Sequence, residues 1–420
     1  MGALNFSQIE AIVYEGVNPE IQKQFEESKG LYNRYLRGKA KRINNRGYRI
    51  GSYGRPAASD GYFPEAGQLP ATDNPSFYEM RVYPMRYASG FELSGDTIEN
   101  IEDADPGALV DQITDIINLA SDTAQKTLDY QAAGTYVGTI AVVASRDSGT
   151  QVTLTSTYAG GSLWGSVKVK EGARLQFIDP ASGTVRNGTT SIVQEGGVNR
   201  STHAITFDAV GAAVATGDLV VFENSYLRAP HGLTDLINND TGVIQMQSRA
   251  TRPELKSVVI DNGGSLINVA TLVQAMLSLR FRTERQGGVN LISGPTQKAA
   301  FMSNAYNLER FQGGGGGVLR MDFDDVKFGK GSWDDYVGIS PDEIIGECDG
   351  TIKKFELKKF GAYSQDGLTM RQYTSGGNYY DRWVGWVGTK YDLGSLAFGC
   401  HFKIKNNSTA GLPTPTSAWA

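Results

Sequence analysis

Residues 51–85, "GSYGRPAASDGYFPEAGQLPATDNPSFYEMRVYPM", decide how the rest of the sequence is interpreted. The stretch has five prolines, four glycines and six aromatic residues in 35 positions, and it shows no helical period. A compact domain rarely contains an unstructured connection of this length, and disordered segments are poor in aromatic residues. We therefore expect an extended arm that lies against another surface.

The sequence on either side of this arm predicts a β-hairpin. Residues 76–93, "SFYEMRVYPMRYASGFEL", alternate as a strand does, with Tyr78, Met80 and Val82 on one face. The preceding segment 48–56, "YRIGSYGRP", is placed to pair with them across the Gly/Pro-rich tip. A two-stranded hairpin is marginal on its own, so we expect a neighbouring copy of the chain to supply the surface on which it lies.

Charged clusters flank the arm on both sides. A basic run extends from Arg37 to Arg49, and an acidic run extends from Glu92 to Asp105. Each run is either an ordinary solvated face or one half of an electrostatic contact between copies. The second alternative has a physical basis, because patches of opposite charge can steer association. The residues that we expect in contacts between copies are Tyr53, Tyr62, Phe63, Phe77, Tyr78, Tyr83, Arg37, Lys41, Arg42, Asp103 and Asp105.

Helix signals precede and follow the arm. Asn18-Pro19-Glu20 predicts a helix start, with apolar residues continuing at helical spacing to Leu36. Asp105-Pro106 opens a stronger helix, "DPGALVDQITDIINLASDTAQKTLDY", which keeps its 3.6-residue period to about Gln131 and spans roughly 40 Å. We call this predicted element the spine helix.

The remaining sequence predicts a β-rich segment and then a mixed region. Residues 136–224 contain short apolar runs separated by Gly, Asp, Asn and Ser turns, which indicates a small β-sandwich or barrel inserted between helical regions. Beyond it, Ser265 is expected to cap a second amphipathic helix, "VNLISG" is a buried strand, and Pro295 opens a further helix. The predicted fold class is therefore α+β.

Composition restricts the classes of partner. The 420 residues include 40 basic and 45 acidic ones, for a net charge of −5, whereas nucleic-acid-binding domains are usually basic. A weakly acidic surface can still lie beside DNA without binding it tightly. Two cysteines favour a reducing compartment, and the sequence shows neither a signal peptide nor an apolar run that would cross a membrane.

Motifs for chemistry are weak. The glycine-rich run "FQGGGGGV" at 311–318 lacks the lysine and hydroxyl residue of a phosphate-binding loop. The three histidines are scattered, and the sequence has neither a zinc-protease motif nor paired cysteines at metal-ligand spacing. We therefore expect no enzyme activity, no cofactor and no metal.

The order of these parts resembles the major capsid proteins of tailed bacteriophages, which have the Hong Kong 97-type fold. The resemblance lies in the extended hairpin, the spine helix, the β-rich insert around "EGARLQFID" and "TGDLV", and the step "VNLISGPTQKAAFMSN". It implies an extension loop that lies over an adjacent subunit, and a structural protein that assembles into hexamers and pentamers around double-stranded DNA in the virion. It also implies assembly in the host cytoplasm, with a portal and a decoration protein as partners. The sequence departs from members that carry a long N-terminal scaffolding segment, because only about 45 residues precede the arm, so we expect a separate scaffolding protein.

The resemblance also implies a division of the chain. The expected parts are an N-terminal arm at 1–46, an extension loop at 47–95, a peripheral segment with the spine helix at 96–135, a β-domain at 136–228, an axial domain with returning peripheral segments at 229–407, and a tail at 408–420. Glycines such as Gly313 and Gly317 would let one sequence fit nonequivalent positions in a shell.

Two other functions stay open at this point. One is a nanocompartment shell, which would keep the fold but enclose protein cargo instead of DNA. The other is a β-rich tail or adhesin protein that binds carbohydrate through residues 136–224. Nucleic acid or cargo inside a particle, or glycan binding by the β-rich segment, would distinguish them.

Overall fold

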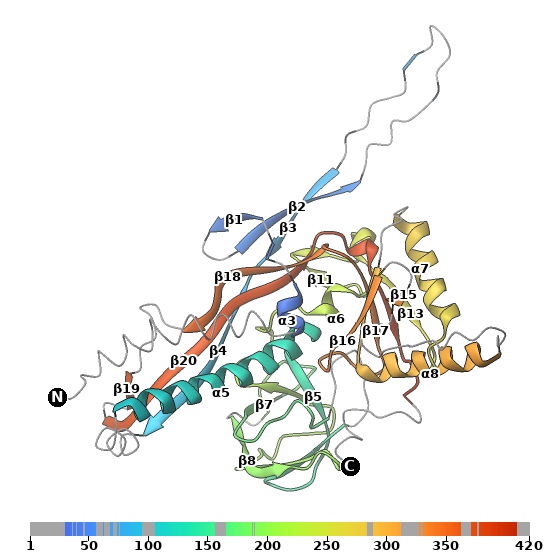
Figure 1. The fold of residues 1–420 in the computed structure, drawn as a ribbon. Helices are drawn as coiled ribbons and strands as arrows, with labels where there is room; N and C mark the ends of the chain where they lie inside the picture. Colours follow the sequence, from blue (N-terminus) through green and yellow to red (C-terminus); the bar gives the residue numbers. More distant parts are fainter. Residues whose placement is uncertain are drawn as a thin grey trace.

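We analysed a computed structural model of the chain. The residues that the structure describes are 30–35, 37–38, 40–44, 47–55, 62, 68–69, 74, 76–94, 106–155, 165–186, 188, 190–283, 289–311, 327–328, 331–362, 371–375 and 378–409. The chain mixes helices and sheets, as the sequence predicts, and Figure 1 shows a long helix, a barrel, two larger sheets and a projecting hairpin.

The centre of the molecule is a long antiparallel sheet with one helix packed against it. Its strands are β4 (Met85–Ser94), β18 (Ile352–Ala362), β19 (Arg371–Ser375) and β20 (Asn378–Ser395). Strand β20 pairs with β18 and β19, and it pairs with β4 along ten successive residues. The sheet therefore joins strands that are far apart in the sequence.

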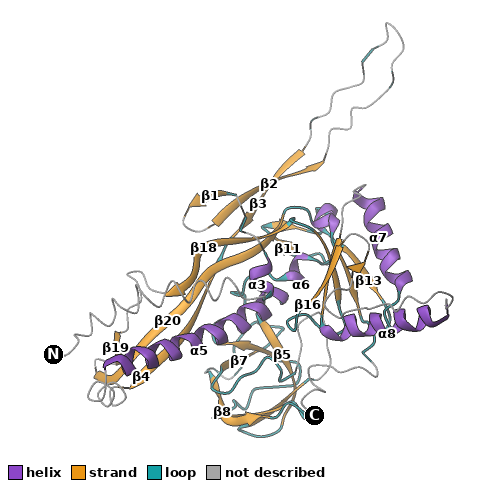
Figure 2. Cartoon of the chain, in the orientation of Figure 1, coloured by secondary structure: helices purple, strands orange, loops and turns teal. Residues whose placement is uncertain are grey.

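Helix α5 (Pro106–Ala133) confirms the predicted spine helix. It starts at Pro106, where a missing backbone N–H removes no helical hydrogen bond. One face of the helix packs against the sheet. Its buried residues recur every four positions and are Ala120, Ala124, Leu128 and Ala132. Small residues at three of these positions let the helix approach β4 and β20 closely (Figure 2).

The predicted hairpin is also confirmed. Strands β2 (Gly47–Arg55) and β3 (Ser76–Val82) pair from Tyr48 opposite Val82 to Arg55 opposite Ser76, and β1 (Lys41–Asn44) adds a third strand at the base. Figure 1 shows β2 and β3 leading away from the body of the molecule. We call residues 47–82 the hairpin arm.

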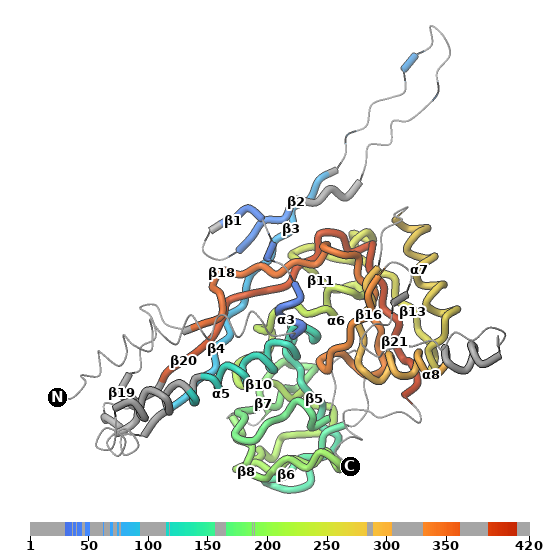
Figure 3. The backbone as a smooth tube through the Cα atoms, viewed as in Figure 1, coloured from blue at the N-terminus to red at the C-terminus, as the bar shows by residue number. Residues whose placement is uncertain are grey.

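Residues 139–222 form a closed six-stranded antiparallel barrel. Its strands are β5 (Thr139–Arg146), β6 (Gln151–Leu154), β7 (Arg174–Ile178), β8 (Ser191–Val198), β9 (Ala204–Phe207) and β10 (Leu219–Phe222). Neighbours around it run β10-β5-β6-β9-β8-β7. Val152, Phe177 and Phe207 fill the interior, and the barrel lies beside α5 (Figure 3).

A second sheet, which contains both parallel and antiparallel pairs, lies beyond the end of α5. Its order is β13 (Val258–Asp261), β21 (Phe402–Lys405), β17 (Ile344–Cys348), β14 (Val289–Ser293), β16 (Gly331–Asp335) and β15 (Lys327–Phe328). Helices α7 (Val269–Thr283) and α8 (Pro295–Phe311) pack on it. The predicted strand at "VNLISG" and the helix opened by Pro295 are thereby confirmed.

Short elements connect these layers. They are α3 (Leu31–Arg34), α6 (Leu233–Leu236), the β11–β12 ribbon (Val243–Ile244 and Gln247–Ser248), and the 3-10 helices η2 (Pro253–Leu255) and η4 (Phe398–Cys400). None of the helices in the described part of the chain is long and apolar enough to cross a membrane.

Two local predictions need correction. The helix predicted from Asn18 to Leu36 is a single turn, α3, where the structure describes it, and Tyr35 is already extended. Ser265 does not cap α7, because the Asn268 side chain accepts the Thr271 N–H at 2.8 Å and the helix starts at Val269. The predictions for residues 1–29 and for Gly313–Gly317 lie outside the described residues.

Candidate self-association surfaces

The hairpin arm has a buried face and an exposed face. Tyr78, Met80 and Val82 join the core of the same chain, and the Arg252 guanidinium lies 4.0 Å from the centre of the Tyr78 ring. Phe77, on the opposite face, is 74% exposed. We therefore leave Tyr78 out of any contact between copies, although the sequence placed it there, because its side chain is already covered.

Exposed apolar side chains continue toward the tip of the arm. Tyr62 is fully exposed and Leu69 is 67% exposed. Tyr83 is half-buried, and its ring lies close to the Cα of Gly47, where a larger residue would collide with it. The backbone of Tyr53 belongs to β2, while its side chain, together with Phe63, lies outside the described residues.

The basic cluster lies beside the base of the arm. Arg37, Lys41 and Arg42 are exposed, and Arg37 forms a parallel bridge with Lys354 of β18. Of the expected acidic counterparts, Asp103 and Asp105 lie outside the described residues. The pairing of the two clusters thus stays a prediction.

An anchor for the N-terminal segment was missed by the sequence analysis. Arg34, at the end of α3, donates to Glu347 Oε1 from both Nε and Nη2 at 3.1 and 3.0 Å, and it also pairs with Asp334. Tyr35 donates its hydroxyl to the other oxygen of Glu347 at 3.0 Å. Burial raises the pKa of Tyr35, so this hydroxyl stays a donor, and the network ties α3 to the six-stranded sheet.

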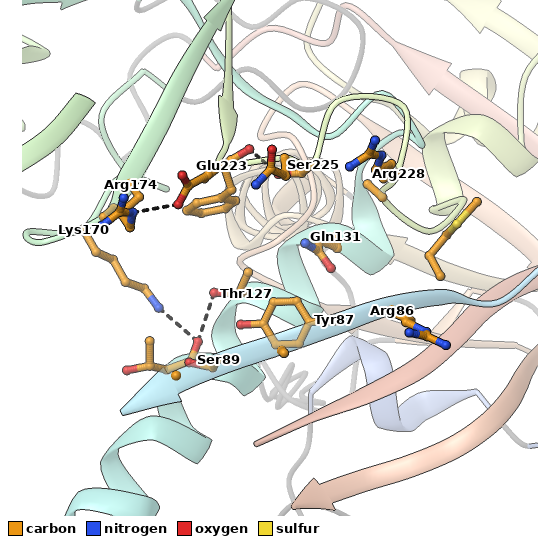
Figure 4. Close-up of a pocket in the computed structure, with 18 of the residues that line it drawn as sticks. Arg86, Tyr87, Ser89, Thr127, Gln131, Lys170, Arg174, Glu223, Ser225 and Arg228 are labelled. Carbon is orange, nitrogen blue, oxygen red and sulfur yellow. Dashed lines mark hydrogen bonds and ion pairs between the residues drawn. The ribbon is translucent and has the colours of Figure 1, made fainter. Parts of the chain in front are cut away.

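A cavity of about 670 Å³ opens between the barrel, α5 and β4 (Figure 4). We call it the β4 cavity. Residues 85–90 of β4 form one side, Thr123, Thr127 and Gln131 of α5 form another, and residues 170–174, 222–225 and 228–230 close it. Lys170 reaches across from the barrel, where its Nζ donates to the Thr123 carbonyl at 3.1 Å.

Cations outnumber carboxylates around this cavity. Its lining includes Arg86, Lys170, Arg174 and Arg228 against Glu171 and Glu223. Only Arg174 is paired among the described residues, with Glu223 at 2.7 Å. Burial, assisted by the charge of Lys126, lowers the pKa of Lys170 to about 8. A partly desolvated lysine of this kind gains from a nearby anion.

Titratable groups elsewhere are arranged for stability. His231 Nδ1 lies 3.1 Å from Asp392 Oδ2 and its ring stacks on Tyr136, which fastens the end of α5 to β20. His401 is buried, which lowers its pKa to about 3, and it bonds to Ser395. Across the described ranges, no group of three or more His, Cys, Asp and Glu residues could hold a metal ion.

Sequence comparison and structural comparison gave different results. No protein-family model and no curated protein matches the sequence. The chain in the cyanophage A-1(L) capsid asymmetric unit, however, aligns with a TM-score of 0.50 at 10% identity, over 90% of this chain and 91% of that one. This chain has a phage capsid fold.

Two further structures show weaker similarity. A chain of Mycobacterium phage Ogopogo has a TM-score of 0.43 at 8% identity, covering 91% of this chain and 94% of that one. The capsid of a native GTA particle gives 0.41 at 9% identity, with 89% and 93% covered. Because the cyanophage alignment covers nine-tenths of both chains, the capsid fold accounts for most of the molecule.

Proposed function

We propose that this chain is the structural major capsid protein of a tailed phage. It has the Hong Kong 97-type fold and self-assembles through hexamers and pentamers into an icosahedral shell around double-stranded DNA. The observation that carries the proposal is the alignment with the cyanophage capsid chain over nine-tenths of both molecules. The protein is not an enzyme, and it acts in the virion after assembly in the host cytoplasm.

The arm supplies the main contact between copies. Its tip carries Tyr62 and Leu69, which are exposed on an isolated copy, and its outer face carries Phe77. Burying one aromatic side chain removes on the order of 150–250 Å² from water, and such residues are enriched at the centres of interfaces. Arg37, Lys41 and Arg42 add charge, with Asp103 and Asp105 of another copy as their expected partners.

The structural elements support the division expected from the resemblance. We assign the N-terminal arm to 1–46, the extension loop to 47–95, the peripheral segment with α5 to 96–135, and the inserted β-domain to 136–228. The barrel occupies the middle of that last range. The axial domain with its returning peripheral strands occupies 229–407, and the tail occupies 408–420.

Partners follow from the same role. With a net charge of −5, the chain contacts packaged DNA only weakly and without sequence preference. We propose a separate scaffolding protein and a portal as assembly partners, and a decoration protein as a further one.

The test is sedimentation of the purified full chain with negative-stain imaging, with and without co-expressed phage proteins. Closed shells, or rings of five or six, support the proposal. A monomer under every condition, including co-expression with a scaffold, rejects it. Particles that enclose protein and exclude DNA in infected cells would instead favour a nanocompartment shell.

A further inference from the structure

Strand β4 is hydrogen-bonded on one side only in the part of the chain that the structure describes. It pairs with β20 along its whole length, from Met85 opposite Tyr391 to Ser94 opposite Arg382, and no described strand pairs with its other edge. In an antiparallel ladder alternate residues bond to a given neighbour, so the others present N–H and C=O groups at the free edge. An edge of this kind accepts an added strand.

The β4 cavity runs along this free edge. Six consecutive residues of β4, 85–90, line it. Successive side chains of a strand point to opposite faces, so a run of six residues borders one cavity only where the cavity follows the backbone. Thr127 and Gln131 of α5 lie on one side of the β4 cavity and Lys170 lies on the other (Figure 4).

Several polar groups in the β4 cavity have no partner of opposite charge or complementary hydrogen bonding among the described residues. Arg86 and Arg228 form no ion pair with any carboxylate in the described residues, and Lys170 bonds only to a carbonyl there. The Oε1 atom of Gln131 is buried and has no hydrogen-bond donor among the same residues. Backbone N–H groups and carboxylates of an added strand would satisfy both needs.

The loop of the hairpin arm has the matching composition. Residues 56–75, "PAASDGYFPEAGQLPATDNP", contain three acidic residues and no basic one. Their longest stretch without proline is 57–63, "AASDGYF", seven residues that can donate backbone hydrogen bonds to an edge of six. Asp60 and Tyr62 are two residues apart and would lie on one face of a paired strand.

We infer that the β4 cavity is the docking site for residues 57–63 of the hairpin arm of a second copy. The segment adds a strand to the free edge of β4, Tyr62 enters the cavity, and Asp60 together with Glu65 just after the segment meets Lys170, Arg86 and Arg228. Main-chain pairing supplies affinity in this type of recognition, and the side-chain pockets supply specificity. The inference rests on the proposed assembly function and names the receiving surface within it.

Photocrosslinking tests the location directly. The full chain carries p-benzoylphenylalanine in place of Tyr62, and light and ¹⁵N-labelled copies are mixed before assembly. We expect mixed-label crosslinks to residues 85–90, 170–174, 222–225 or 228–230. The same probe in place of Phe77, which is exposed on the paired strands just before the loop, is the matched control and should not reach these residues. Crosslinks from Tyr62 to other sites in formed particles, or within one copy only, would overturn the inference but leave the proposed function standing.

Charge exchange provides a second measurement. The variant K170E/R228E and the variant D60K/E65K should each lower the yield of sedimenting particles at least tenfold, with the thermal midpoint of the unassembled chain as the check on folding. Combining all four substitutions should restore particles, because opposite charges again meet. A combined chain no better than either parent would contradict the site. Absence of particles from the unmodified chain with its scaffold would instead reject the proposed function itself.

Discussion

At the scale of single residues, α3 is held by two acids, of which Asp129 is half-buried and Glu347 is buried. Asp129 of α5 accepts the Tyr32 N–H at 2.9 Å, and burial raises the pKa of Asp129 to about 6. Glu347 accepts from Arg34 and Tyr35. The N-terminal segment is therefore fastened on one side to the spine helix and on the other to the six-stranded sheet.

The raised pKa of Asp129 predicts a pH-dependent stability. The folded chain retains this proton up to about pH 6 and the unfolded chain loses it near 3.8, so the stabilising contribution is complete below pH 3.8 and is lost as the pH rises through 6. Asp129→Asn keeps the acceptor oxygen and cannot ionise. Its unfolding free energy relative to wild type should rise by about 2 kcal/mol between pH 4 and pH 7. Urea titrations at both pH values test this, and a constant difference would contradict it.

The Arg34 network predicts a large loss of stability on truncation. Arg34→Ala leaves the Glu347 carboxylate buried without its cation, and such a change costs about 3 kcal/mol or more. Arg37→Ala, three residues later at an exposed position, is the control and should cost less than about 0.5 kcal/mol. Equal denaturation midpoints for the two variants would show that the anchor does not stabilise the fold.

At the scale of elements, α5 positions both the sheet and the barrel. Leu128 of α5 is fully buried, and the Tyr391 hydroxyl of β20 donates to the Leu128 carbonyl at 3.4 Å. Leu119, on the same helix, is 69% exposed. The two leucines therefore offer a matched pair in which helix propensity is identical and burial differs.

We expect Leu128→Ala to lower the free energy of unfolding by about 2–5 kcal/mol, because the removed side chain leaves a cavity between helix and sheet. Leu119→Ala should change it by no more than about 0.5 kcal/mol. Chemical denaturation of the unassembled chain measures both. Similar losses for the two variants would mean that the packing of α5 on the sheet is not as described.

The sequence predicts those elements whose signals are local. The apolar residues of the spine helix recur along most of its 28 residues, and the hairpin alternates beside a Gly/Pro-rich tip, so both were identified with small errors at their ends. The pairing of β4 with β20 has no local signal, because its residues lie at opposite ends of the chain. Arg34 was missed for a similar reason, since its position in the sequence does not indicate where its partners Asp334 and Glu347 lie.

At the scale of the whole molecule, the arm should be separable from the fold. Arg55 and Ser76 are paired, so residues 56–75 can be replaced by Asn-Gly as a two-residue turn. The thermal midpoint of the unassembled chain should stay within a few degrees, since the replaced residues lie beyond Tyr78, the buried residue of the arm nearest the loop, while closed shells should be lost. Sedimentation and negative-stain imaging measure the second effect.

A Gly/Ser segment of the same twenty residues is the control for loop length. It should also fail to form shells, because length without side chains gives no docking surface. Normal shells from either variant would remove the arm from the assembly mechanism.

The junction of the arm with β4 has a mechanical consequence. Strand β3 ends at Val82 and β4 begins at Met85, so any tension applied to the arm passes directly into β4. The pull then runs along the strand, and the ten residue pairs that join β4 to β20 bear the load together in shear instead of opening one at a time. In a container under internal pressure, this geometry would spread the force from each neighbour across the central sheet and the helix that braces it.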